Sequence, residues 1–280
     1  MSTINPSSIA DALELRFGDR PALPAEIPGA DTIARLLARS SQRRFTKAPV
    51  DDRLIELLCA AALSAPSKSD LQQADIVIVT DPAKRARIAA LLPDNGWIPS
   101  APVFLVFCGN NLRQRELARL KGTPFPNDHL DPFFNATVDA AIVLASFVCA
   151  AEAAGLGCCP VSVIRNHARE ISEMLALPDY VFPVAGLGVG WPEGKTPLSP
   201  RLPLAVTVHR DRHDTAAFTR ELARYDARRI ELRPYANQRD PARFGNAARY
   251  GWSDDKARQY AVPERVDFGS YVRSRRFKLD

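Results

Sequence analysis

The sequence predicts an α/β or α+β sandwich, in which helices pack on a central sheet. Helical segments alternate with short runs rich in β-branched residues, and no internal repeat interrupts this alternation. Of the 280 residues, 46% are apolar and 25% are charged. This composition is sufficient for a full hydrophobic core and is not typical of a disordered chain.

Five segments have the periodicity of helices. Residues 51–65 begin with two acidic residues, which favour a helix N-terminus, and then carry a leucine-rich face. Residues 135–154 are so uniformly apolar that we expect a helix buried on nearly all sides and ended by Gly155. The remaining helices are expected at residues 31–40, 82–92 and 167–177.

Short β-branched or alternating runs predict strands at residues 74–81, 102–109, 161–163, 180–190 and 204–209. The run GLGVG at 186–190 lacks the spacing of a dinucleotide-binding fingerprint and opens no helix. We interpret its glycines as positions that allow close packing at a strand end. Residues 1–30 are expected to form an extended arm, and residues 110–133 a surface excursion.

The sequence indicates a soluble, cytoplasmic protein. The first 20 residues contain no run suited to a signal peptide, and the most apolar window, 140–151, is too short to span a bilayer. The five cysteines are odd in number and none has CxxC spacing, which favours free thiols in a reducing compartment. The four histidines show no metal-ligand spacing, so we expect no metal.

Charge is unevenly distributed along the chain. Residues 201–280 carry a net charge of +7, whereas the first 200 residues carry −2. A basic C-terminal third suits nucleic acid, a phosphorylated cofactor or an acidic partner. No nucleic-acid-binding signature accompanies the charge, so nucleic acid is the weaker interpretation.

Three motifs carry groups that bind anions. RSSQRRF at 39–45 offers guanidinium forks and hydroxyls, which form charge-assisted hydrogen bonds with phosphate. APSKSD at 65–70 adds two hydroxyls and an ammonium, and SPRLP at 199–203 holds Arg201 between two prolines. Each motif alone is more often a surface feature than a site. The GxSxG elbow of serine hydrolases is absent.

The order of these motifs resembles the FMN-dependent nitroreductase family. The resemblance runs from Ala34 to His209, through RSSQRRF, SAPSKSDLQ, AAEAAGLGC and GLGVGWP followed by PRLP. YANQRDPARFG at 235–245 and DFGSYVRSRRF at 267–277 are similar to the NADPH-using branch of nitro and flavin reductases. The resemblance implies an α+β, nitroreductase-like α/β sandwich with a central, mostly antiparallel sheet flanked by helices, in an intertwined homodimer.

Three parts follow from the resemblance. They are an N-terminal arm at 1–30, an FMN-binding core at 31–213, and a basic helical excursion with a C-terminal dimer arm at 214–280. The apolar helix at 135–154 is the expected dimer core, because it has no obvious polar face.

The resemblance also assigns FMN contacts. Arg39, Ser41 and Arg43 take the contacts to the phosphate and the ring, and Ser40 and Gln42 contribute backbone. The loop Ser67, Lys68, Ser69 and Asp70 matches a segment that passes along the flavin.

Further positions match the family around the ring and the phosphate. Asn95 falls where an amide meets the isoalloxazine, and Ser199 with Arg201 matches a pair on the phosphate side. The reactive edge of the flavin faces a stretch of backbone formed by Pro160, Val161, Ser162 and Val163.

Two departures from the family pattern affect the expected site. Ser199 stands where relatives of the NADPH-using branch tend to have lysine, so one phosphate charge is missing, which Lys68 could restore. Asp70 replaces a commonly neutral residue. A carboxylate near the flavin disfavours its anionic reduced form, so we expect a lowered redox potential, and an unchanged midpoint in Asp70→Asn would contradict this.

The resemblance implies chemistry carried by the cofactor, with no catalytic side chain. In this family, FMN accepts hydride at N5 from NAD(P)H and reduces a second substrate in the same pocket, which implies ping-pong kinetics. The expected acceptors are flat aromatic compounds, namely nitroarenes, quinones or free flavins. Arg233 and Arg239 lie where the NADPH-using branch binds the 2′-phosphate, although a solvated basic helix end explains them equally well.

Two alternatives remain at this point. One is a specialised FMN enzyme on the same scaffold, such as a reductive dehalogenase or an ene-type reductase. The other is a non-catalytic basic binding protein without flavin. A yellow protein bleached by NADPH would distinguish an enzyme from the second alternative.

Overall fold

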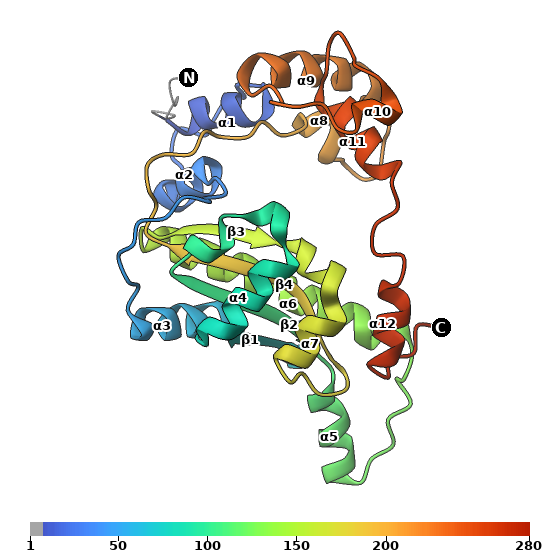
Figure 1. The fold of residues 1–280 in the computed structure, drawn as a ribbon. Helices are drawn as coiled ribbons and strands as arrows, with labels where there is room; N and C mark the ends of the chain where they lie inside the picture. The colour runs from blue at the N-terminus through green and yellow to red at the C-terminus, as the bar shows by residue number, and fades with distance from the viewer. Residues whose placement is uncertain (1–7) are drawn as a thin grey trace. The chain divides into compact units, whose positions relative to one another are not determined.

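The computed structural model describes residues 8–280, so residues 1–7 of the predicted arm lie outside the described part of the chain. The chain divides into two compact units, which we describe separately (Figure 1). Unit 1 comprises Met1–Ser40 and Thr196–Glu264, and unit 2 comprises Ser41–Lys195 and Arg265–Asp280.

Unit 2 is built on a four-stranded antiparallel sheet with the strand order β1-β2-β4-β3. The strands are β1 (Ala74–Ile78), β2 (Val103–Asn110), β3 (Gly157–Val161) and β4 (Val181–Gly190). The two central strands, β2 and β4, are buried along almost their whole length. Their continuous apolar runs therefore fit strands covered on both faces, and the predicted antiparallel sheet is confirmed.

The remaining elements of unit 2 are helices and short 3₁₀ turns. They are α3 (Asp52–Leu63), η1 (Lys68–Asp70), α4 (Pro82–Leu91), η2 (Pro93–Asn95), η3 (Ile98–Ser100), α5 (Leu112–Lys121), α6 (Leu130–Ala153), η4 (Ser162–His167), α7 (Ala168–Met174) and α12 (Phe268–Ser274). The strand expected at 161–163 is thus wrong, because β3 ends at Val161 and a 3₁₀ turn follows. The surface excursion expected at 110–133 contains α5.

Helices cover both faces of the sheet (Figure 1). On one face, α3 and α6 close a core with Leu105, Phe107 and Leu187. On the other face, α4 and α7 close a second core with Phe104 and Val106. Successive residues of β2 therefore supply opposite cores, as the alternation of side chains along a strand requires.

Helix α6 is the longest helix of unit 2 and only partly buried. It ends at Ala153, two residues before Gly155, which adopts a left-handed conformation at φ 86°, so the predicted stop is confirmed. By length and composition α6 could cross a membrane, yet it packs against α3 and β2 in the core. The expectation of burial on nearly all sides is wrong. An exposed apolar stripe runs along α6 and consists of Phe134, Val138, Ala141, Ala145 and Cys149.

Unit 1 is helical in its described residues. Its elements are α1 (Ile9–Phe17), α2 (Ala30–Ala38), α8 (Leu204–Thr207), α9 (Phe218–Leu232), α10 (Pro241–Phe244) and α11 (Trp252–Tyr260). Helix α1 lies in the segment expected to be extended, and its N-cap Ser8 accepts a hydrogen bond from the Asp11 backbone N–H. The strand expected at 204–209 is also wrong, because helical bonding such as Val208 N–H to Leu204 O replaces a ladder.

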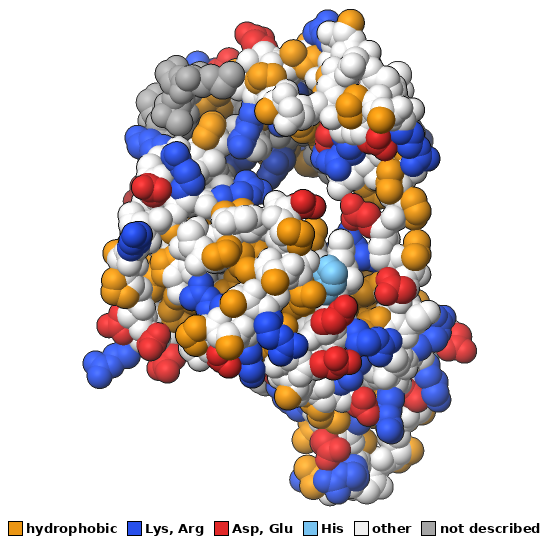
Figure 2. Space-filling model, in the orientation of Figure 1, with side chains coloured by type: hydrophobic (Ala, Val, Ile, Leu, Met, Phe, Trp, Pro, Cys, Tyr) orange, Lys and Arg blue, Asp and Glu red, His pale blue; other side chains and the backbone are white. Residues whose placement is uncertain are grey.

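Part of the basic charge of unit 1 is used in local ion pairs. Arg224 lies 2.9 Å from Asp19 and 2.9 Å from Glu221, and Arg239 lies 3.4 Å from Asp255. Figure 2 likewise shows basic and acidic side chains interspersed on the visible face of the molecule. The excess of arginine at the C-terminal end therefore contributes to structure as well as to net charge.

The glycines of β4 have the packing role expected of them. A Cβ on Gly188 would lie 2.4 Å from the Trp97 ring, and a Cβ on Gly190 would lie 2.4 Å from Pro102. Any side chain at these positions would displace the segment of residues 97–102 from the sheet.

All five cysteines are free thiols. Cys108, Cys158 and Cys159 are buried in the sheet. Burial, with a smaller contribution from the Asp75 carboxylate, raises the pKa of Cys108 to about 12. This thiol is therefore protonated and unreactive at neutral pH.

Candidate active site

A buried arginine organises one corner of unit 1. Arg16, near the end of α1, is only 5% exposed. Its Nε donates to Leu37 O at 2.7 Å, its Nη1 donates to Ser199 O at 2.9 Å, and its Nη2 donates to Arg39 O. In return, the Arg16 carbonyl accepts the Arg201 N–H at 2.5 Å. One guanidinium therefore joins three chain segments, and it brings the backbone of Arg39, Ser199 and Arg201 together.

Further groups converge on Ser199 within the same corner. Arg233 Nη1 donates to Ser199 Oγ at 2.8 Å and to Pro197 O at 2.7 Å. Tyr225 donates its hydroxyl to Pro200 O at 3.1 Å. Burial raises the pKa of Tyr225, and nearby guanidinium groups, including that of Arg201, oppose this shift. The corner thus concentrates positive charge around one serine hydroxyl.

In unit 2, Gln42 fastens the first anion-binding motif to the sheet. Its backbone N–H donates to Cys158 O at 2.9 Å, and its Nε2 donates to Gly194 O at 2.9 Å. A Cβ on Gly157 would lie 2.6 Å from the Gln42 side chain, so this glycine makes room for it. Gln42 is buried, whereas Arg43 and Arg44 are exposed. The backbone of this motif is therefore held rigidly beside β3.

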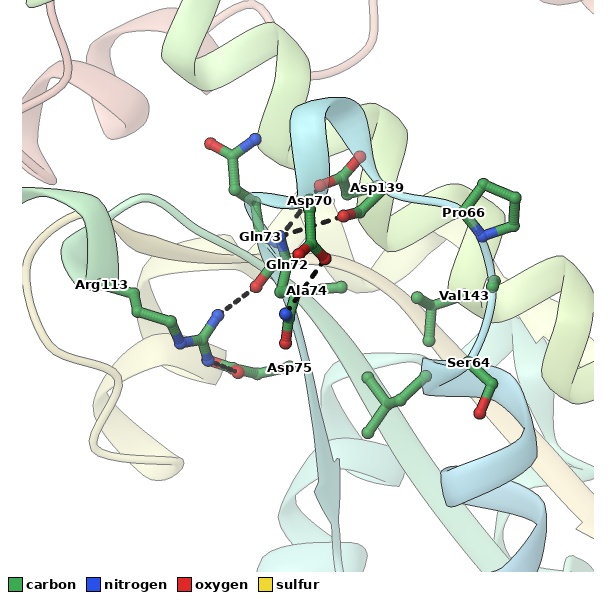
Figure 3. A pocket seen from close by; sticks show the side chains of 13 residues that line it. Ser64, Pro66, Asp70, Gln72, Gln73, Ala74, Asp75, Arg113, Asp139 and Val143 are labelled. Atoms are coloured by element: carbon green, nitrogen blue, oxygen red, sulfur yellow. Dashed lines mark hydrogen bonds and ion pairs between the residues drawn. The ribbon is translucent and has the colours of Figure 1, made fainter.

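Unit 2 also contains a pocket of about 570 Å³ between the loop that follows α3, the start of β1 and α6 (Figure 3). Its walls include Ser64, Pro66, Ser67, Asp70 and Val143. The volume lies in the range of small-molecule and cofactor sites, roughly 300–1,000 Å³.

Asp139 anchors the loop at this pocket. This residue of α6 is 1% exposed, and its two carboxylate oxygens accept the Lys68 N–H at 3.1 Å and the Gln73 N–H at 3.2 Å (Figure 3). Between these anchors, Ser69, Asp70 and Gln72 all have left-handed backbone, with φ between 49° and 56°. Such conformations are rare outside glycine, so the anchoring carboxylate stabilises an unusual loop.

A second charged group borders the pocket. Arg113 Nη2 lies 2.6 Å from Asp75 Oδ1, and its Nη1 donates to Gln72 O (Figure 3). The Asp70 carboxylate accepts only the Gln72 side-chain amide, at 3.2 Å, among the contacts of the described residues. The pocket edge therefore holds one neutralised ion pair and one carboxylate without a cation.

The structure groups the residues singled out in the sequence as follows. Arg39, Ser199, Arg201 and Arg233 meet around Arg16 in unit 1, where Ser40 Oγ also donates to Thr196 O at 3.2 Å. Ser41, Gln42 and Arg43 lie beside β3, which ends with Pro160 and Val161, and Ser162 and Val163 begin η4. Ser67, Lys68, Ser69 and Asp70 form the pocket loop.

Two of the candidate residues lie apart from these groups. Asn95 ends η2, two residues before Trp97, whose ring centroid lies 6.3 Å from that of Phe45. Arg239 pairs with Asp255, not with Arg233 or Ser199.

Sequence reasoning missed Arg16, Asp139 and Arg113. A lone aspartate inside the apolar run 135–154 was the available signal for Asp139, because an unpaired carboxylate is costly to bury and needs donors. Arg16 and Arg113 gave no comparable signal, since their principal partners include backbone carbonyls distant in sequence.

Fold and site together define an α+β protein with a large pocket and a separate corner rich in anion-binding groups. Comparison with known proteins gives the family. The nitroreductase family model matches residues 36–191, and the model of the nitroreductase family C-terminal domain matches residues 199–280. The chain belongs to the nitroreductase family.

Individual relatives agree with this assignment. The chain is 34% identical over 226 residues to the oxygen-insensitive NADPH nitroreductase of Salmonella typhimurium, covering 80% of this chain and 88% of that protein. It is 32% identical over 212 residues to the FMN reductase [NAD(P)H] of Bacillus subtilis, covering 75% and 84%. The solved structure of NfrA2 from B. megaterium superimposes with a TM-score of 0.80 at 31% identity, covering 89% of this chain and 99% of that one.

Proposed function

We propose that this chain is an NAD(P)H-dependent, FMN-containing reductase that favours NADPH and reduces nitroaromatics, quinones or free flavins by a ping-pong mechanism. The observation that carries the proposal is that both family models match in order and together span residues 36–280 with only a short gap. The relatives named above are FMN and NADPH enzymes by name, which supports the same cofactors here.

The donor groups of the chain fit the phosphate of FMN. In unit 1 the Arg233 guanidinium donates to the Ser199 hydroxyl, and the backbone contacts of Arg16 hold the chain at Arg39 and Arg201 close to this pair. Guanidinium forks and hydroxyls are the groups that bind a phosphate dianion with charge-assisted hydrogen bonds. We propose that Arg39, Ser40, Ser41, Gln42, Arg43, Ser199 and Arg201 hold the phosphate end of FMN, as the family pattern assigns them. Arg233 supplies a cation at Ser199, where relatives tend to have lysine.

The groups proposed for the ring are of a different kind. The 570 Å³ pocket is sized for a flat aromatic system and is bordered by hydroxyls, amides and apolar groups, together with three carboxylates and the guanidinium of Arg113. We propose that the loop Ser67, Lys68, Ser69 and Asp70, together with Asn95 and the backbone of Pro160–Val163, lies along the ring. When bound, FMN supplies hydride chemistry at N5. The residues of this chain bind and orient the ring and the acceptor, and the proposal requires no acid or base side chain.

Preference for NADPH is proposed to depend on Arg233 and Arg239. Because Arg233 already contacts Ser199, its loss is expected to weaken FMN binding as well as NADPH preference, whereas loss of Arg239 should affect the nucleotide alone. The test compares kcat/KM for NADPH and NADH in Arg233→Ala and Arg239→Ala, with the FMN Kd measured in parallel. An unchanged NADPH/NADH ratio in both variants would contradict this part of the proposal.

A homodimer is proposed on the basis of α6. Its exposed stripe of Phe134, Val138, Ala141, Ala145 and Cys149 recurs at helical spacing, which is typical of a helix that packs against a partner. We expect light scattering to give a dimer for the wild type, and Val138→Glu to shift it toward monomer with loss of bound FMN. Replacement of an exposed polar residue on the same helix, Asp131→Asn, serves as the control. A monomeric wild type would contradict the dimer.

The direct test of function is the visible absorption spectrum of the protein, purified from a cytoplasmic expression host. We expect a yellow protein whose visible flavin band is bleached by NADPH without oxygen and returns on addition of a nitroarene or quinone. A colourless protein that cannot be reconstituted with FMN would overturn the proposal.

A further inference from the structure

The charges that border the pocket of unit 2 are predominantly negative. Its walls include the carboxylates of Asp70, Asp75 and Asp139 but only one cation, Arg113. Lys68 lies two residues from Asp70, yet its side chain is not part of the pocket wall. An acceptor that enters this pocket therefore meets more negative than positive charge.

Two of the three carboxylates are already committed to protein partners. Asp75 pairs with Arg113 at 2.6 Å, and Asp139 accepts two backbone N–H groups while 1% exposed. Their charge is therefore compensated locally, and neither faces solvent freely enough to dominate the electrostatics of the entrance.

Asp70 differs from Asp75 and Asp139 in its exposure, its hydrogen bonding and its backbone conformation. It is exposed, it accepts a hydrogen bond only from the Gln72 amide, and no described lysine or arginine pairs with it. Its backbone is left-handed at φ 56°, and the flanking Ser69 and Gln72 are also left-handed. The loop conformation that Asp139 anchors thus presents an uncompensated carboxylate at the pocket (Figure 3).

We propose that Asp70 determines acceptor specificity by charge, so that this enzyme favours neutral or cationic aromatic acceptors and discriminates against anionic ones. This inference rests on the proposed function, because it takes the acceptor to bind against the flavin ring in this pocket. A like charge a few ångströms from a bound anion in a partly solvated site costs about five- to tenfold in affinity.

The test uses two acceptors of nearly the same shape, para-nitrobenzamide, which is neutral, and para-nitrobenzoate, which is an anion. The measured quantity is the ratio of kcat/KM for the amide over the carboxylate within each variant, so that any effect on flavin content cancels. We expect the wild type to favour the amide by about five- to tenfold. In Asp70→Asn the ratio should fall toward one.

The control removes a negative charge elsewhere in unit 2. Glu173 is an exposed residue of α7 that does not border the pocket, so Glu173→Gln should keep the wild-type ratio. A second measurement needs no variant. Rising ionic strength should reduce the wild-type ratio, because salt screens an exposed carboxylate, and should leave the Asp70→Asn ratio unchanged.

The outcomes separate the inference from the function on which it rests. Equal kcat/KM for the two acceptors in the wild type, a ratio that persists in Asp70→Asn, or a ratio insensitive to salt would each overturn the inference alone. Failure to reduce either acceptor, together with failure of NADPH to bleach a bound flavin, would overturn the proposed function and the inference with it.

Discussion

At the scale of single residues, the site depends on buried polar groups whose partners are backbone atoms. Arg16 is the main case in unit 1. Its guanidinium is buried and donates to carbonyls of residues that lie 21, 23 and 183 positions away in the sequence. The planar guanidinium of arginine holds several donors in fixed directions, whereas the donors of a lysine ammonium rotate about a single atom. This position therefore requires the guanidinium itself.

Removal of Arg16 should therefore destabilise unit 1 more than the loss of an ordinary charge. Arg16→Ala leaves buried carbonyls without donors, and we expect the free energy of unfolding to fall by about 3 kcal/mol. Arg16→Lys should fall between this variant and the wild type. Urea denaturation measures the change, and FMN titration should show weaker binding in both variants.

The matched control is Arg20→Ala. Arg20 is an exposed arginine just beyond α1 that pairs with Asp11, so its loss should cost less than about 1 kcal/mol. An equal fall in the free energy of unfolding in Arg16→Ala and Arg20→Ala would contradict the stabilising role of the buried contacts between Arg16 and the backbone carbonyls.

At the scale of elements, one helix supports the pocket loop. Asp139→Asn keeps the shape of the side chain but replaces one acceptor oxygen by an N–H₂ group that faces a backbone N–H. We expect a loss of about 2 kcal/mol in the free energy of unfolding and weaker FMN binding. The specific readout is hydrogen exchange at the Lys68 and Gln73 amides, which should become faster.

Asp131→Asn on the same helix is the control for Asp139→Asn. Its carboxylate accepts the Asn135 side-chain amide in an exposed position, so its loss should leave exchange at Lys68 and Gln73 unchanged. Unchanged exchange at these amides in Asp139→Asn would refute the anchoring role.

A second element-scale contact fastens the chain end of unit 2 to the segment between α5 and α6. Asp128 pairs with Arg115 at 2.5 Å and with Lys278 at 2.8 Å. Burial raises the pKa of Asp128, but the hydrogen bonds from Lys278 and Arg115 outweigh burial and hold it below its usual value. A depressed carboxylate pKa stabilises the folded state above the unfolded-state pKa, and the stabilisation is lost as pH falls through the folded-state pKa.

Asp128→Asn should accordingly lower the free energy of unfolding at neutral pH by about 1 kcal/mol. The difference from the wild type should begin to shrink below about pH 4, where the carboxylate of the unfolded chain becomes protonated, and should disappear as pH falls through the lower folded-state pKa. Urea midpoints across a pH series measure this. A difference that stays constant through the acid range would be inconsistent with the ion pairs.

At the scale of the whole molecule, the sequence predicted what depends on local pattern. The two central strands were predictable, because continuous apolar runs indicate strands covered on both faces. The stop of α6 at Gly155 was predictable from glycine alone. The alternating run 204–209 misled, because alternation produces a strand only where a neighbouring strand supplies hydrogen bonds, and α8 lies there instead.

Only those parts of the candidate site were predictable that show in the order of the motifs along the chain and in the chemistry of their side chains. The sequence suggested RSSQRRF, the Ser67–Asp70 loop and Ser199 as candidates because hydroxyls and guanidinium groups recur in a specific order. Arg16 and Arg113 could not be predicted, because every residue has a backbone carbonyl and the sequence does not show which of them will accept a hydrogen bond from a distant arginine. The exposed stripe of α6 was also missed, because apolar residues on every side of a helix do not reveal which side lacks a partner in one chain.

The central claim is that this chain holds FMN and passes electrons from NADPH to an aromatic acceptor in two separate half-reactions. The most direct measurement is anaerobic titration of the purified protein with NADPH, followed by rapid mixing with para-nitrobenzamide. We predict stoichiometric bleaching of the flavin band by NADPH, release of NADP⁺ before the acceptor is added, and full reoxidation by the acceptor. A flavin that NADPH does not reduce, or a reduced flavin that the acceptor cannot reoxidise, would contradict it.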